Sequence, residues 1–136
     1  MKVIISEEQS DKVKQKLKDM VDKFGPDSLG IDLYKLIEMG VIEKYMGKLN
    51  LYRKPIKSLG DLEFVGGYLS LIDTKLESLG KLEWVGGGLS LSKTNITDLG
   101  NLVYVGGDLY LRDCPLSKLS DEEINKQVFV GGEIIR

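Results

Sequence analysis

The segment Tyr68–Gly87, YLSLIDTKLESLGKLEWVGG, decides the fold because it recurs along the chain. It follows LNLYRKPIKSLGDLEFVGG at Leu49–Gly67 and precedes GLSLSKTNITDLGNLVYVGG at Gly88–Gly107. A fourth copy, Asp108–Gly132, begins DLYLRDCPLSKLS and takes an insertion before VFVGG, so the Val-Gly-Gly motifs are spaced by 20, 20 and 25 residues. Such a period predicts a solenoid, in which each repeat (a rung) buries its apolar side chains only by stacking on its neighbours.

Each rung opens with two leucines that alternate with polar residues, as Leu69 and Leu71 do. This period of two predicts a strand with one buried face, and stacking of the rungs predicts a parallel sheet. Further apolar columns recur at Ile56, Leu59 and Leu62 and at the equivalent positions of later rungs. About six apolar side chains per rung are enough to fill the inside of one coil.

Two features of the repeat favour tight turns. Glycine follows a leucine at Gly60, Gly80 and Gly100, and Val-Gly-Gly provides a second corner, because glycine permits positive φ and close backbone approach. Just past each strand lies the column Lys54, Thr74, Thr94 and Cys114. We expect the two threonines to bond the exposed backbone there, Cys114 to do so weakly, and Lys54 not to do so.

These motifs carry a family resemblance. The pattern LxLxxTx[IL]xxL resembles a short leucine-rich repeat, and LEFVGGYLSL resembles the repeats of receptor L domains. The chain is most similar to VGG/LxL repeat proteins of tailed phages, over residues 48–136. The resemblance implies a right-handed leucine-rich-repeat-like α+β solenoid of about four rungs. It also implies a phage-encoded function as a virion or assembly component, or as a small inhibitor of a host factor.

The ends of the chain carry helical patterns. Residues 1–47 predict an N-terminal cap: a capping box at Ser6 and Gln9, an apolar stripe ended by Gly25-Pro26, a second helix over about residues 28–39, and a helical turn over 41–46. We expect a short strand at residues 3–5. Residues 119–136 predict a C-terminal cap, with a capping box at Ser120 and Glu123, a helix over 121–127, and a closing strand formed by 129–130 and 134–135. The alternative is that residues 1–47 are a docking module of their own.

Composition narrows the function classes. The 136 residues include 42% hydrophobic and 29% charged residues and carry a net charge of −2, which suits one domain without an evident nucleic-acid surface. There is no histidine and one cysteine, so we expect no histidine-based catalysis, no disulfide and no metal site. No apolar run reaches the roughly 18 residues of a membrane span, and the first residues do not form a signal peptide. We therefore expect an intracellular or virion protein that is not secreted.

The repeat pattern does not bring candidate catalytic residues together. Cys114 falls in the backbone-bonding column, which indicates a structural role. The Val-Gly-Gly motifs lack the Lys-Ser/Thr and the helix of a phosphate-binding loop. Carboxylates are scattered over the turns, at Asp73, Glu77, Glu83, Asp98 and Asp113. The sequence predicts no enzyme and no cofactor.

Two surfaces are candidate binding faces. Residues between the leucines should face outward on the sheet, and tyrosine and arginine there are typical interface anchors. The predicted protein-binding face contains Tyr52, Tyr68, Ser70, Ile72, Ser90, Ser92, Tyr110 and Arg112. A second candidate face has one aromatic residue per rung before the valine, at Phe64, Trp84, Tyr104 and Phe129. These rings either stiffen a flank by stacking or form an exposed stripe.

The resulting hypothesis is a non-enzymatic protein–protein interaction module that uses its strand face. The partner is a protein, either of the host, of the virion or a second copy of this chain, with no role for nucleic acid, membrane or metal. A virion or assembly role and inhibition of a host factor are the alternatives. Carbohydrate binding is more distant and requires an exposed aromatic column.

Overall fold

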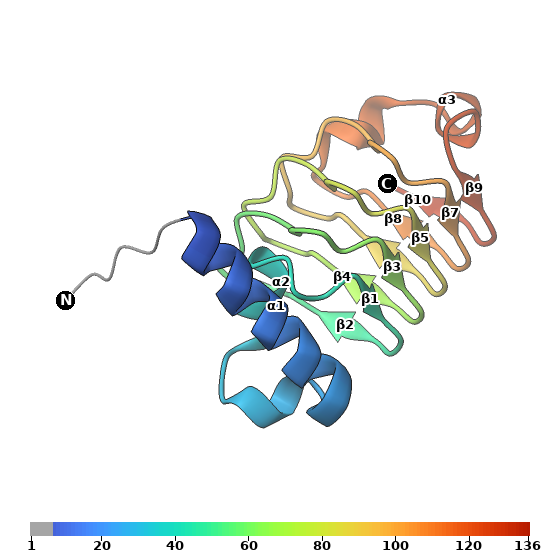
Figure 1. Ribbon diagram of the computed structural model, residues 1–136. Helices are drawn as coiled ribbons and strands as arrows, with labels where there is room; N and C mark the ends of the chain where they lie inside the picture. Colours follow the sequence, from blue (N-terminus) through green and yellow to red (C-terminus); the bar gives the residue numbers. More distant parts are fainter. Residues whose placement is uncertain (1–6) are drawn as a thin grey trace.

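The computed structural model describes the backbone of residues 7–136 and the side chains of residues 11–136. It confirms a solenoid of parallel strands (Figure 1). Every rung contributes strands to two separate five-stranded sheets instead of the single sheet predicted. The second sheet arises because each rung has a short strand that ends at the valine of Val-Gly-Gly. The two glycines then turn the chain into the leucine strand of the other sheet.

The leucine sheet contains the predicted LxL strands, in the order β10-β8-β6-β4-β2. Its register aligns Leu69 with Leu49 and Leu89, so identical side chains stack in the core. Its strands are two residues each: β2 (Leu49–Asn50), β4 (Leu69–Ser70), β6 (Leu89–Ser90), β8 (Leu109–Tyr110) and β10 (Ile134–Ile135).

The aromatic sheet lies on another side of the coil, in the order β1-β3-β5-β7-β9. In each of its repeat strands the aromatic residue faces outward and the following valine is buried. Its strands are β1 (Lys44–Tyr45), β3 (Phe64–Val65), β5 (Trp84–Val85), β7 (Tyr104–Val105) and β9 (Phe129–Val130).

The core lies between the sheets and the turns and is built from the predicted apolar columns. Leu71, Leu76, Leu79, Leu82 and Val85 are each at most 1% exposed, and the same positions of the two neighbouring rungs are also buried. In the last rung the equivalent residues Leu119 and Val130 are half-buried. A continuous stack of this kind removes each rung's apolar surface from water only when its neighbours are present.

The polar column that follows the leucine strands bonds the backbone as predicted. The Thr74 hydroxyl donates to the Leu71 carbonyl at 2.8 Å, and the Thr94 hydroxyl donates to the Leu91 carbonyl at 2.7 Å. The Cys114 thiol lies 3.3 Å from the Ile96 carbonyl oxygen. One residue earlier the backbone is left-handed in every rung, at Arg53, Asp73, Lys93 and Asp113, with φ between 56° and 57°.

The segment before β1 differs from the prediction. The helix α1 (Glu7–Phe24) ends before Gly25-Pro26 as expected. The second helix is broken into the 3₁₀-helix η1 (Pro26–Leu29) and α2 (Leu33–Glu38), because Gly30 adopts a left-handed φ of 66° between them. The predicted helical turn over 41–46 is wrong, since Lys44–Tyr45 pairs with β3 as strand β1. The predicted strand at 3–5 and the capping residue Ser6 lie outside the described residues.

The last repeat contains the insertion. The 3₁₀-helix η2 (Pro115–Lys118) precedes α3 (Asp121–Asn125), which is shorter than predicted. The Ser120 hydroxyl accepts the Glu123 N–H at 3.1 Å, which confirms Ser120 as the N-cap of α3. Ile124 is fully buried. The expected closing strand is two strands, β9 and β10, one in each sheet.

Candidate functional site

The predicted protein-binding face is the outer face of the leucine sheet, called the tyrosine face below. Tyr52 is 50% exposed and Arg112 is exposed, as expected of interface anchors. Tyr68, Ile72, Ser92 and Tyr110 are half-buried. Ser70 and Ser90 are only 4% and 1% exposed, which corrects their assignment to the accessible face. Ser70 lies in register between Asn50 and Ser90, and Ser90 lies between Ser70 and Tyr110.

The centre of the tyrosine face contains Tyr68, Gly88 and Tyr110, and Tyr110 pairs in register with Ser90. The ring of Tyr68 lies across Gly88, because a Cβ on that glycine would be 3.1 Å from the Tyr68 Cδ2 atom. The Tyr110 hydroxyl lies 3.3 Å from the Asp108 carboxylate and donates to it. The negative charge of Asp108 raises the pKa of Tyr110. The phenol therefore remains a neutral hydrogen-bond donor over the physiological pH range.

The aromatic column (Phe64, Trp84, Tyr104 and Phe129) is stacked along its length, with Trp84 and Phe129 exposed and Phe64 and Tyr104 half-buried, which combines the two predicted outcomes. Its ring centroids are 6.3, 3.7 and 5.5 Å apart in succession, with interplanar angles of 13°, 13° and 15°. Trp84 remains 37% exposed and Phe129 61% exposed. Because the rings cover one another's faces, the column presents mainly ring edges to solvent.

A repeated hydrogen-bond pattern places an acidic column beside the aromatic column. The N–H groups of Glu63 and Phe64 both donate to the Glu43 carbonyl, at 2.8 and 3.2 Å, and the next rung repeats this arrangement. Two consecutive side chains then face outward, whereas a regular strand would turn one of them inward. Glu63 and Glu83 are exposed, and Phe64 and Trp84 lie next to them.

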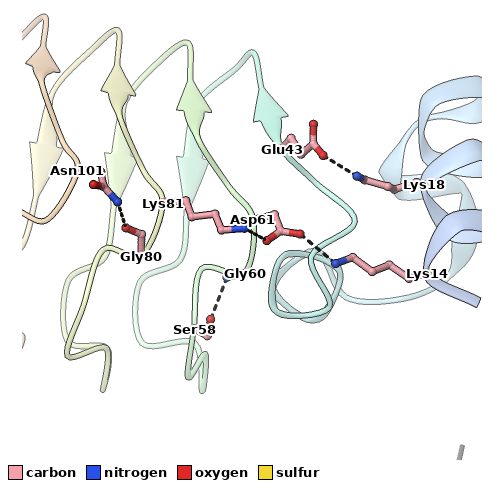
Figure 2. Close-up of polar contacts among 9 residues, drawn as sticks. All are labelled: Lys14, Lys18, Glu43, Ser58, Gly60, Asp61, Gly80, Lys81 and Asn101. Atoms are coloured by element: carbon pink, nitrogen blue, oxygen red, sulfur yellow. Dashed lines mark hydrogen bonds and ion pairs between the residues drawn. The ribbon is translucent and has the colours of Figure 1, made fainter. Parts of the chain in front are cut away.

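Ion pairs connect α1 to the aromatic-sheet side of the solenoid (Figure 2). Asp61 receives Lys14 from α1 and Lys81 from the next rung, each at 2.9 Å. Lys81 and Lys14 lower the pKa of Asp61 to about 2. Lys18 of α1 binds Glu43 and lowers the pKa of that carboxyl. At the next position of the same column, the Asn101 amide donates to the Gly80 carbonyl at 3.2 Å.

The remaining reactive groups serve the fold. Cys114 is 3% exposed and contacts Thr94 in the stacked column. Across the described residues, no three histidine, cysteine, aspartate or glutamate residues lie close enough together to hold a metal ion. None of the described helices has the length and apolar character required to cross a membrane. The exposed tyrosine, arginine and aromatic side chains described above lie on the two outer sheet faces, which are the candidate sites of function.

Comparison of the chain with protein-family models, with curated proteins and with solved structures gives no match. The function proposed below therefore rests on the residues and their geometry.

Proposed function

We propose that this chain is a non-enzymatic protein-binding module that recognises its partner with the tyrosine face. The observation that carries the proposal is the pair formed by Tyr68, whose ring lies across Gly88, and Tyr110, which pairs in register with Ser90, with Arg112 and Tyr52 at the margin. Tyrosine and arginine provide large contact areas and directional hydrogen bonds, and they dominate the binding energy of many interfaces.

The backbone beneath this face supports the proposal because it is rigid. Each strand is bonded to its neighbours, and buried leucines lie directly below the tyrosines. A fixed surface loses little conformational entropy on binding.

We propose in addition that the solenoid is right-handed and leucine-rich-repeat-like, with about four rungs. Helical caps over residues 1–47 and 119–136 cover its terminal coils.

The test is capture of the partner protein by the immobilised chain. The double variant Tyr68→Ala/Tyr110→Ala should lose capture while its melting temperature stays close to that of the wild type. The matched control is Phe24→Ala/Lys75→Ala, which removes an exposed aromatic residue of α1 and an exposed lysine, both outside the tyrosine face, and should retain capture. Undiminished capture by Tyr68→Ala/Tyr110→Ala would contradict the proposal.

Self-assembly is the second candidate function, and the sheet edges favour it. Strands β9 and β10 stand at one end of their sheets, and among residues 7–136 each has a paired strand on one side only. Edge strands can pair with another chain. In this alternative the chain is a virion or assembly component. Inhibition of a host factor would use the same tyrosine face. The bound partner would then be an enzyme or a regulator of the host.

Carbohydrate binding is less favoured. A sugar ring stacks on an open aromatic face, whereas the faces of Trp84 are directed at Phe64 and Tyr104. Only the terminal rings of the column have one side without an aromatic neighbour.

A further inference from the structure

The aromatic sheet carries a groove that the proposed function does not use. Its volume is about 400 Å³, and it lies between the acidic and aromatic columns. Two carboxylates, those of Glu63 and Glu83, occupy equivalent positions on adjacent strands, which are about 4.8 Å apart in a parallel sheet. The groove is lined by Lys44, Glu63, Phe64, Glu83, Trp84 and Val103.

The charges around this groove leave the two carboxylates available. Lys81 is held by Asp61 at 2.9 Å, and Lys18 is held by Glu43. Among the side chains of residues 11–136, none forms an ion pair with Glu63 or Glu83. Like charges on adjacent strands repel each other, so a cation placed between them relieves an unfavourable interaction. Lys44, at the β1 end, is the positive group that lines the groove itself.

The apolar side of the groove determines what kind of cation fits. Trp84 and Val103 are 37% and 56% exposed and offer a hydrophobic surface beside the carboxylates. An arginine or lysine buries its methylene groups along such a surface while its charged end reaches outward. Arginine suits a pair of carboxylates better than lysine does, because its planar guanidinium offers several N–H groups in a fixed fork.

We propose that this groove binds an arginine side chain of an extended protein segment, independently of the tyrosine face. The arginine methylenes lie along the edges of Phe64 and Trp84 and against Val103. The guanidinium donates to Glu63 and Glu83. The surface is too narrow for a stable second copy of the chain, whose interface would bury about 800 Å² per partner, and its negative charge repels nucleic acid.

Trp84 allows a direct test because it is the single tryptophan of the chain. The probe is the pentapeptide GRGRG, blocked at both ends and titrated at low salt while tryptophan fluorescence is recorded. We expect a saturable change with GRGRG, weaker binding of the lysine peptide GKGKG, and no binding of GEGEG. The double variant Glu63→Gln/Glu83→Gln should bind GRGRG at least about tenfold more weakly, since it removes both charged acceptors.

Two further variants locate the peptide in this groove. Lys44→Gln removes the repelling cation and should strengthen binding of GRGRG. Tyr68→Ala/Tyr110→Ala should leave it unchanged, so failure of the tyrosine-face proposal and failure of this one remain distinguishable. Absence of a saturable signal, or equal affinity in Glu63→Gln/Glu83→Gln, would overturn the proposal. An unchanged emission maximum and melting temperature in the unliganded variants show that their fold is intact.

Discussion

The carbonyl oxygen of Gly66 lies against the Cα of Gly86 on the next rung, where a Cβ would overlap it. We therefore expect Gly86→Ala to lower the free energy of unfolding by several kcal/mol, because the stacked backbones must separate. Gly47→Ala is the matched control at the first such corner, where a Cβ would meet its nearest atom at 3.9 Å. Urea denaturation of both variants measures the difference. Equal stability of the two would contradict close backbone stacking at this corner.

The buried hydroxyl of Thr94 should stabilise the turn after β6. Thr94→Val keeps the side-chain shape but removes the hydrogen bond to the Leu91 carbonyl. We expect a loss of about 1–2 kcal/mol in the free energy of unfolding, because a buried acceptor loses its partner. Thr97→Val is the control at an exposed position of the same rung and should change stability by less than about 0.5 kcal/mol. A neutral Thr94→Val would argue against a role for this column.

Lys93 occupies a left-handed conformation, with φ of 57°, that costs little for glycine and more for other residues. Lys93→Gly should raise the free energy of unfolding by up to about 1 kcal/mol, and with it the urea concentration at the midpoint of denaturation. Lys93→Val should lower it, because a β-branched side chain clashes in this conformation. The order glycine, lysine, valine in decreasing stability is the expected result, and the reverse order would refute the assigned backbone.

Asp61 should make the attachment of α1 depend on pH. Its folded pKa of about 2 lies below the unfolded value of about 3.9, so its contribution is present above pH 4. That contribution is lost as the pH falls from about 4 to about 2. Asp61→Asn should therefore reduce the protection of α1 amides from hydrogen exchange at neutral pH, and should remove part of the pH dependence in that window. Parallel pH curves for wild type and variant would contradict this assignment.

Periodicity predicted the leucine sheet because its strands repeat an LxL alternation over several residues, as at Leu69 and Leu71. The aromatic sheet was missed because each of its segments, such as Phe64–Val65, offers a single aromatic–valine step before Gly-Gly interrupts the alternation. Strand β1 was missed for a related reason. A signal existed, since Glu43 and Gly47 stand 20 residues before Glu63 and Gly67.

The candidate sites were only partly predictable. Alternation correctly placed Tyr52 and Arg112 at the surface, but it carries no information about the neighbours that cover Ser70 and Ser90. The left-handed column also lacks a clear signal, since lysine and arginine share it with the two aspartates. The groove beside Trp84 depends on two consecutive outward side chains, which an alternating pattern does not predict.

The central claim is that this solenoid is a recognition module whose sheet faces are free for a different molecule. Light scattering coupled to size-exclusion chromatography, over a wide range of protein concentration, tests it most directly. We predict a constant mass of 15.2 kDa, that of one chain. A defined oligomer, or a mass that grows with concentration, would contradict the claim and identify self-packing as the function.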